Sequence, residues 1–290
     1  MKDSVKEKAY AKINISLDIT GKRDDGYHDM VMVMQTVSIC DDIKISLNDS
    51  GVIRSYSNLH FIPGDDRNLA VRASKRYLEE IGEQVPGLRI DIHKDIPVGA
   101  GMGGGSSDAA AVLRGMNKLF DDRLPADELQ KLAEDVGSDT AFCVKGGTAL
   151  AEGRGEILTE LPAFPDSIFV VCKPGFSIST PELFKKIDAA PLRRHPDTAG
   201  ILDALDKGDL REICRRMYNV FEDVDDRRMR TVTEIKNRLM DFGTLGSIMT
   251  GTGSAVFGIF DDDNKAQLAM ESLKQDYRFC YIAKPVKKLM

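Results

Sequence analysis

The sequence contains no tryptophan, no paired cysteines and no surplus of positive charge, and the last two absences exclude whole classes of protein. Its 46 aspartate and glutamate residues outnumber its 40 lysine and arginine residues, so the formal net charge is −6. General binders of nucleic acids or anionic membranes usually carry a basic surplus, so we expect neither partner. An anionic small-molecule ligand remains open, because a positive pocket can form locally on an acidic protein.

The five cysteines are odd in number, widely spaced and free of any Cys-x-x-Cys pair. This pattern is typical neither of a disulfide framework nor of a zinc site, so we expect small, buried hydrophobic side chains in a reducing compartment. The first eight residues are charged and lack an apolar h-region, and no run approaches the length of a transmembrane helix. We therefore expect a soluble, cytoplasmic protein without a metal cluster, whose oligomeric state the sequence does not determine.

What the sequence does contain is the patterning of a mixed α/β chain, long enough at 290 residues for about two domains. Apolar and polar residues alternate over residues 11–19, which is the period of a half-buried strand. Further strands are predicted over residues 30–39, 43–47, 88–92, 168–171, 246–249, 255–260 and 279–283. Helices are predicted over residues 69–82, 106–120, 125–136, 138–144, 181–187, 199–205, 210–217, 228–240 and 265–275, with Asn68 and Ser138 as N-caps. A change of composition places a boundary near residue 160.

The strongest signal is the segment 97–108, Pro-Val-Gly-Ala-Gly-Met-Gly-Gly-Gly-Ser-Ser-Asp, between a predicted strand and a predicted helix. Its five glycines remove side chains, so backbone N–H groups can close on an anion at the positive end of the helix. Ser106 and Ser107 add hydroxyls for phosphate or for bound Mg²⁺, and Asp108 can interact with the dipole of the first turn. A flexible linker would give no reason for the regular helix that follows. The segment therefore predicts a phosphate site.

Two other phosphate motifs fit this segment less well. Gly99-x-Gly101-x-x-Gly104 matches the dinucleotide fingerprint, but a run with five glycines matches it easily, and the first half of the chain lacks βαβ repetition. The sequence Gly-x-x-x-x-Gly-Lys-Ser/Thr is absent, which excludes a Walker P-loop.

Three polar residues outside the loop have a chemical and an ordinary interpretation. Asp139 follows a glycine at the start of a short predicted helix, where it can act as a base for a hydroxyl nucleophile. Its spacing alone favours simple stabilisation of the helix dipole. Lys12 and Asn14 lie on the polar side of an apolar strand, and the pattern alone favours a solvent-facing edge for both.

Two turns are also candidates. Tyr27 and His28 follow Gly26 and can stack on and hydrogen-bond a flat heterocycle, although an aromatic residue at a turn more often packs. Residues 250–255, Thr-Gly-Thr-Gly-Ser-Ala, form either a second hydroxyl-rich glycine turn at the site or an ordinary tight hairpin. The pattern does not decide between them.

Taken together, these segments resemble the three motifs of the GHMP kinases, named after galactose, homoserine, mevalonate and phosphomevalonate kinases. The matching segments are 11–14 with 26–28, then 97–110, then 250–255, and the order and length agree over nearly the whole chain. Asp-Gly-Tyr-His at 25–28, combined with Gly-Gly-Gly-Ser-Ser at 103–107, resembles the members that act on a cytidine diphosphate polyol. Departures are Ala100 and Met102, where the family often has Gly and Leu, and Thr140-Ala141 in place of Val-Pro.

The resemblance implies the two-domain GHMP kinase fold, an α/β (α+β) architecture with the glycine-rich loop at a helix N-terminus. Residues 1–160 would form an ATP-binding domain and residues 161–278 a substrate-binding domain. The last strand, at about 279–290, would return to the first domain. ATP and Mg²⁺ are the implied cofactors, and a small molecule is the implied partner.

The resemblance also implies roles for particular residues. Asp139 would be the catalytic base, and Lys12 would hold the reacting hydroxyl and stabilise the developing charge. Tyr27 and Phe184 would sandwich cytosine while His28 reads its polar edge, and the substrate site would further be lined by Asn14 and Thr180. The implied ATP-binding residues are the loop and two residues near the adenine: Pro97, Val98, Gly99, Ala100, Gly101, Met102, Gly103, Gly104, Gly105, Ser106, Ser107, Asn68 and Lys94.

The implied activity is ATP-dependent phosphorylation of the 2-hydroxyl of 4-diphosphocytidyl-2-C-methyl-D-erythritol, a step of non-mevalonate isoprenoid precursor biosynthesis. The alternatives are a homoserine-type or mevalonate-type kinase, which should lack the aromatic clamp, and a catalytically silent nucleotide-binding regulator. A dinucleotide oxidoreductase is the most distant alternative.

Overall fold

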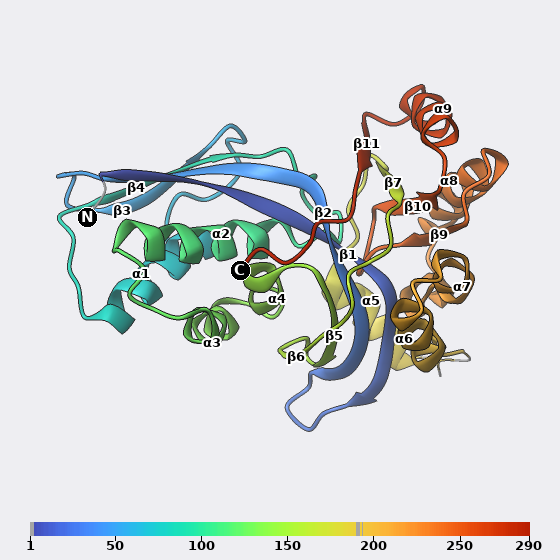
Figure 1. The fold of residues 1–290 in the computed structure, drawn as a ribbon, viewed down its shortest axis with the longest axis horizontal. Helices are drawn as coiled ribbons and strands as arrows, with labels where there is room; N and C mark the ends of the chain where they lie inside the picture. Colours follow the sequence, from blue (N-terminus) through green and yellow to red (C-terminus); the bar gives the residue numbers. More distant parts are fainter. Residues whose placement is uncertain (1–2, 190–191, 193) are drawn as a thin grey trace.

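The computed structural model describes residues 3–189, 192 and 194–290. Figure 1 shows two β-sheets: the smaller lies at one end of the molecule, and the long strands of the larger run from the other end toward it. The larger sheet has seven strands. Five follow the order β3-β4-β2-β1-β8. The other two lie beside the first part of β2: residues 30–35 of β2 pair with β5, which pairs with β6, whereas residues 42–47 of β2 pair with β4. These strands are β1 (Ser4–Lys22), β2 (His28–Leu47), β3 (Ile53–Ser57), β4 (Leu88–His93), β5 (Thr148–Gly153), β6 (Ile157–Glu160) and β8 (Tyr218–Asn219). The smaller sheet is antiparallel, with the order β11 (Phe279–Ala283), β7 (Ile168–Lys173), β10 (Val256–Phe260) and β9 (Gly246–Met249).

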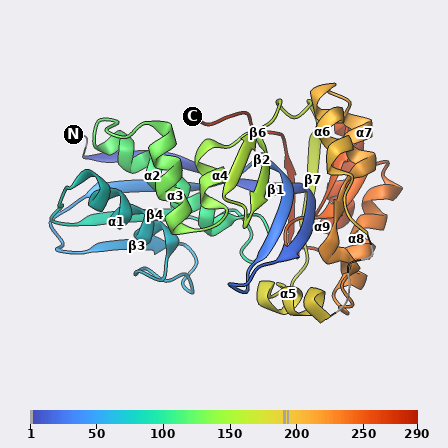
Figure 2. The same cartoon turned by 90° about the horizontal axis from the view of Figure 1, so that it is seen from below.

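The helices form two groups (Figures 1 and 2). One face of the large sheet is covered by α1 (Leu69–Ile81), α2 (Gly104–Leu119), α3 (Ala126–Val136) and α4 (Thr140–Lys145). The end that carries the small sheet holds α5 (Thr180–Ala189), α6 (Thr198–Asp206), α7 (Leu210–Arg216), the 3₁₀ turn η1 (Val220–Asp223), α8 (Met229–Asp241) and α9 (Asp263–Lys274). None of the described helices has the length and apolar character needed to cross a membrane.

Helix α2 is the central helix because its residues are small and apolar on nearly every side. Ala109, Ala110 and Ala111 are fully buried, and a Cβ on Gly115 would lie 2.6 Å from Cδ1 of Ile45. This close approach of helix and sheet places the N-terminus of α2, and the glycine-rich loop before it, against the middle of β1.

The middle of β1 is buried on both faces, which corrects the solvent-facing placement that its pattern favoured for Lys12 and Asn14. Ile13 and Ile15 pack in a cluster that includes residues of the small sheet, so one face of β1 is covered by the second lobe. Lys12 and Asn14 point to the opposite face and are 4% and 0% exposed. Alternation correctly identified the two faces, but burial of the polar one depends on elements distant in sequence.

Several predicted boundaries are confirmed and others are wrong. Asn68 caps α1 through a 3.0 Å bond from Ala70 N–H to its Oδ1, and Gly82 ends that helix with φ 66°. The strands predicted over 30–39 and 43–47 are one continuous strand, β2, because neither glycine nor proline interrupts the segment between them. Ser138 is not a cap, since α4 begins at Thr140 with Asp139 in the N-cap position. Strands β3, β5, β6 and β8 were not predicted.

The end of the chain connects the two lobes. Strand β11 pairs with β7 in the small sheet, and the tail beyond it then bridges to Val37 through Pro285 and to Gly146 through Lys288. The predicted boundary near residue 160 falls between β6 and β7. The division into an ATP-binding and a substrate-binding domain stays a prediction. Of the cysteines, four are buried and Cys40 is partly exposed, and all five are free.

Candidate active site

A cavity of about 1010 Å³ brings together most of the motifs identified in the sequence. Its wall includes the glycine-rich loop, the N-terminus of α2, the Tyr27-His28 turn, the start of α4 and the turn 251–253. The predicted site residues that line it are Lys12, Tyr27, His28, Asn68, Lys94, Asp139, Thr180, Phe184 and every loop residue from Pro97 to Ser106. These segments span more than 200 positions of the chain, so the cavity is a product of the tertiary fold.

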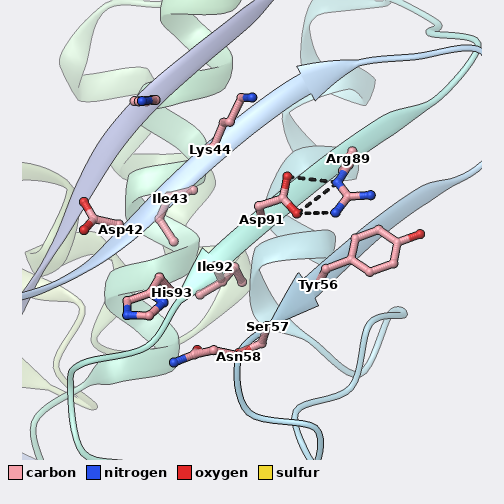
Figure 3. A pocket seen from close by; sticks show the side chains of 11 residues that line it. Asp42, Ile43, Lys44, Tyr56, Ser57, Asn58, Arg89, Asp91, Ile92 and His93 are labelled. Atoms are coloured by element: carbon pink, nitrogen blue, oxygen red, sulfur yellow. Dashed lines mark hydrogen bonds and ion pairs between the residues drawn. The ribbon is translucent and has the colours of Figure 1, made fainter.

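A second hollow, of about 600 Å³, is lined by residues of β1, β2, β3 and β4 and by Asn58, and none of its lining residues belongs to the glycine-rich loop (Figure 3). Two of its charged side chains are paired with each other, because Arg89 Nε lies 2.9 Å from both carboxylate oxygens of Asp91. The Arg89 guanidinium also covers the ring of Tyr56 at 4.3 Å. This hollow contains no helix N-terminus and no glycine turn, so the chemistry predicted from the motifs points to the larger cavity.

The glycine-rich loop has a backbone that side chains would oppose. Gly99, Gly101 and Gly103 have φ values of 64°, 75° and 69°, a left-handed region that favours glycine. Helix α2 begins at Gly104, two residues earlier than predicted, and Gly103 supplies no side-chain cap. The N–H groups of the first turn therefore have no side-chain acceptor and are free to bind an anion at the positive end of the helix.

The turn 250–255 packs directly on this loop. A Cβ on Gly101 would lie 2.1 Å from the carbonyl oxygen of Thr250, and Ala255 N–H donates to Ala100 C=O at 3.1 Å. The Thr250 hydroxyl oxygen accepts from Asn14 N–H at 3.0 Å and lies 3.3 Å from Gly101 C=O. The turn therefore packs against the loop and holds it next to β1, and it is not an isolated hairpin.

Lys12 and Asp139 meet beside the glycine-rich loop. Their side chains come from β1 and from the start of α4, and Lys12 Nζ lies 3.3 Å from Asp139 Oδ2. Lys12 is buried against Gly103, whereas the Asp139 side chain is 28% exposed and makes no capping hydrogen bond. The carboxylate is therefore directed to the lysine and the cavity, and the simple dipole role that its spacing favoured does not describe its contacts.

Two predicted site residues lie behind the cavity wall. Asn14 is fully buried, and its Oδ1 accepts from Lys12 Nζ at 2.8 Å, so it orients the lysine. Ser107 is also buried, with its hydroxyl 3.5 Å from Cys143 Sγ beneath the helix. Ser106, by contrast, lines the cavity. The structure thus places Asn14 and Ser107 as supports for groups that reach the cavity.

The two residues predicted near adenine have their polar groups engaged by the protein. The Asn68 amide caps α1 and donates to Ser55 Oγ and to Pro63 C=O, which fixes the segment before the helix. Lys94 Nζ forms ion pairs with Asp41 and, at 2.7 Å, with Asp108 Oδ2, and this cluster is almost completely buried. Both residues line the cavity, but neither has an uncommitted polar end.

The Lys94 cluster holds two carboxylates and one ammonium under the start of α2. Burial and the neighbouring Asp41 raise the pKa of Asp108 to about 8, although Lys94 acts in the opposite direction. Burial disfavours the charge of Lys94, but Asp108 and Asp41 outweigh it and raise the pKa of the lysine. Below about pH 8 this raised pKa favours a proton on Asp108, which would relieve the excess negative charge of the cluster.

The raised pKa of Asp108 predicts a pH-dependent difference between wild type and Asp108→Asn. A carboxyl whose pKa rises on folding stabilises the fold fully below its unfolded pKa, near 3.8, and loses that contribution as the pH rises through about 8. The wild type should therefore lose on the order of 1–3 kcal/mol of unfolding free energy relative to the variant between about pH 5 and about pH 9. Urea unfolding at several pH values measures the difference. A constant difference, or one that grows in favour of the wild type, would contradict the prediction.

At the other end of the cavity, aromatic side chains form a flat apolar site. The Phe184 ring stacks on the His28 ring with centroids 4.6 Å apart and planes 25° apart. Tyr27 is 56% exposed and is covered on one face by Arg154 at 5.0 Å. Thr180 Oγ1 lies 2.9 Å from Thr252 Oγ1. Tyr27 and Phe184 both line the cavity, and the sandwich of cytosine between them stays a prediction.

Three further residues contribute to the site and were not identified from the sequence. Arg154, on the turn between β5 and β6, lines the cavity over Tyr27. Asn219 is buried and donates to Met249 C=O and Gly251 C=O, so it fixes the turn 250–255. Asp188 contacts His28. Each lies in a segment without a motif, and only its neighbours in space mark it.

Comparison with known proteins gives a single family. Residues 68–147 match the sequence model of the GHMP kinases N terminal domain, and residues 201–278 match that of the GHMP kinases C terminal domain. A protein of Clostridium beijerinckii (strain ATCC 51743 / NCIMB 8052), called 4-diphosphocytidyl-2-C-methyl-D-erythritol kinase, is 42% identical over 97% of this chain and 100% of its own length. The chain belongs to the GHMP kinase family. A protein of the same name from Clostridium novyi (strain NT) is 43% identical over 96% of this chain and 99% of its own.

Solved structures of GHMP kinases agree with this fold. A crystal structure of 4-(cytidine 5'-diphospho)-2C-methyl-D-erythritol kinase is 31% identical, covers 97% of this chain and 99% of its own, and gives a TM-score of 0.81. A mevalonate kinase from L. major, at 18% identity over 100% of this chain and 98% of its own, gives a TM-score of 0.77 and shows the shared fold. The mixed α/β architecture predicted from the sequence is thereby confirmed, and as a GHMP kinase the protein uses ATP as phosphate donor.

The glycine-rich loop of this GHMP kinase fits ATP phosphates. Three left-handed glycines and a helix start without a side-chain cap leave backbone N–H groups open at the loop, which is what a phosphate cradle needs. Within residues 3–189, 192 and 194–290, no group of three or more His, Cys, Asp or Glu side chains is placed to hold a metal ion. A Mg²⁺ ion that binds together with ATP can take phosphate oxygens and water as ligands, so its presence would not require a protein cage.

Proposed function

We propose that this GHMP kinase phosphorylates the 2-hydroxyl of 4-diphosphocytidyl-2-C-methyl-D-erythritol at the expense of ATP, a step in isoprenoid precursor synthesis. The observation that carries the proposal is the meeting of Lys12 and Asp139 next to the glycine-rich loop. A phosphate group held by the loop and a hydroxyl held by Lys12 would lie close to one another. Two relatives called 4-diphosphocytidyl-2-C-methyl-D-erythritol kinase match nearly the whole chain.

In this proposal Asp139 takes the proton of the hydroxyl, and Lys12 holds the oxygen and offsets the negative charge that develops on it. The N–H groups at the start of α2 bind phosphate oxygens and keep the transferred group in line. Asn14 fixes the Lys12 ammonium through the 2.8 Å bond, so the charge is in place before the substrate binds.

The remaining roles divide the cavity into two ends. We propose that Tyr27, His28, Phe184 and Thr180 receive the cytidine end of the substrate, since they form its flat aromatic wall. Asn68 and Lys94 also line the cavity, and Lys94 fixes the start of α2 through its contacts with Asp108 and Gly104. Mg²⁺ would accompany the ATP phosphates, and the Ser106 hydroxyl lines the cavity at the loop where it could approach them. The cytoplasmic location and the absence of a nucleic-acid or membrane partner stay predictions.

A coupled assay of ADP release tests the proposal. With Mg²⁺ and ATP, turnover is expected on 4-diphosphocytidyl-2-C-methyl-D-erythritol and not on homoserine or mevalonate. Turnover on homoserine or mevalonate instead would retain the GHMP kinase chemistry and contradict the cytidine end of the site. If no ADP is released with any of the three substrates while ATP still binds, a nucleotide-binding regulator would be favoured.

A further inference from the structure

His28 is held from two sides by a single helix. Phe184 and Asp188 lie four residues apart on α5 and so share one face of it. Phe184 stacks on the His28 ring, and Asp188 Oδ1 lies 2.7 Å from His28 Nε2. The His28 side chain is only 7% exposed, so these two contacts define the plane and the rotation of the ring.

Asp188 is an ionised acceptor. Its second oxygen, Oδ2, accepts from Lys22 Nζ at 2.6 Å, and the hydrogen bonds from Lys22 and His28 lower the pKa of Asp188. An ionised carboxylate can only accept hydrogen bonds, so His28 Nε2 must carry a proton. In the neutral imidazole ring the other nitrogen, Nδ1, then has a free lone pair and accepts.

The accepting nitrogen is available to a ligand. His28 lines the cavity together with Tyr27 and Phe184, and no described residue is hydrogen-bonded to Nδ1. A heterocycle that offers an exocyclic amino group can donate to this nitrogen. A heterocycle with a carbonyl oxygen at the same position would instead bring two acceptors together, which costs the hydrogen bond and adds repulsion.

We propose that Asp188 is a positioning residue that fixes His28 as a hydrogen-bond acceptor and thereby selects cytosine over uracil. The ligand class rests on the proposed function, since that function puts a cytidine diphosphate at this end of the cavity. The tautomer of His28 does not rest on it, because the contacts of Asp188 alone determine it.

The first test measures the tautomer without any substrate. The chain has four histidines, so ¹⁵N-histidine labelling gives four rings, and His28→Gln assigns the His28 signals. At a pH at which the ring is neutral, the wild type is expected to show a protonated Nε2 and an unprotonated Nδ1. A proton on Nδ1 would overturn the inference whatever the enzyme's substrate is.

The second test measures discrimination, with CDP and UDP as competitive probes against turnover. Asp188→Leu removes the acceptor, so the preference for CDP over UDP is expected to fall by roughly 10-fold, the effect of about one hydrogen bond. Asp188→Asn keeps an accepting oxygen toward Nε2 and should preserve most of the preference. Lys22→Met is the matched control, because it breaks the ion pair with Asp188 but leaves the His28 contact.

The pattern across these variants separates positioning from a purely structural role. If Asp188 only ties α5 to the β1–β2 hairpin, Lys22→Met and Asp188→Leu would weaken CDP and UDP binding equally and leave the preference unchanged. That result would overturn the inference. Thermal unfolding of each variant confirms that it is folded before the probes are compared.

Discussion

Asp139→Asn is expected to lower kcat by a factor of about 10²–10⁴ while leaving the affinity for ATP nearly unchanged. The amide has the same shape as the carboxylate but cannot take the proton of a hydroxyl. Lys12 keeps its hydrogen bond to Asn14 in this variant, so the ammonium should stay in place. Steady-state kinetics on the cytidine substrate and calorimetric titration with ATP measure the two quantities separately.

Asp135→Asn is the matched control for this substitution. Asp135 lies on α3, its side chain is 61% exposed, and its described ion pair is with Arg76 at the surface. Its loss should change kcat by less than twofold, because exposed pairs contribute little to stability and this one is not among the residues lining the cavity. Full activity in Asp139→Asn would contradict the assignment of Asp139 as the base, and parallel loss of ATP binding would point to a structural role.

Gly101→Ala is expected to destabilise the fold by about 3 kcal/mol and to weaken ATP binding strongly. Gly101 has φ 75°, and a Cβ there would lie 2.1 Å from the carbonyl oxygen of Thr250. The collision is with backbone, so no side chain can move aside to relieve it. Either the loop or the turn 250–255 must shift, and both form the wall of the phosphate end.

Gly51→Ala separates this collision from the strain of a left-handed backbone. Gly51 has the same φ of 75°, but no atom lies within 4 Å of the position of its Cβ. This control should cost only about 1–2 kcal/mol and leave ATP binding unchanged. Urea unfolding and ATP titration of both variants provide the comparison. Equal destabilisation by the two substitutions, with ATP affinity retained in Gly101→Ala, would show that the loop and the turn do not depend on close contact.

The predictions that came from local patterns held best. The cap at Asn68, the helix over α1 and the glycine loop before α2 depend on residues within one or two turns of each other. Strands β3, β5, β6 and β8 were missed. Strand β5 lies in a glycine-rich segment and gains stability from pairing with β2, and β6 pairs in turn with β5. The β-propensity of a segment contains little information about which strand it will pair with.

The site shows the same limit. Residues such as Gly101 and Asp139 were identified because motifs mark them, whereas Asn219, Arg154 and Asp188 lie outside the motifs. Asn219 fixes the turn 250–255 by bonds to residues 30 and 32 positions away. A single sequence contains no sign of such a partner, since the bond depends on two segments that meet only in the folded chain.

The sequence by itself indicated an exposed helix start at the loop, because Gly99, Gly101 and Gly103 precede α2 and Gly104 and Gly105 are its first residues. It also determined which side of β1 is polar. Only the tertiary structure decided that this side is buried and that Lys12 on it meets Asp139 at the start of α4. The tertiary structure likewise brings Asp188 of α5 to His28. The physical reason is range, since backbone conformation depends on near neighbours, while the burial, pairing and protonation of a side chain depend on whatever the fold packs against it.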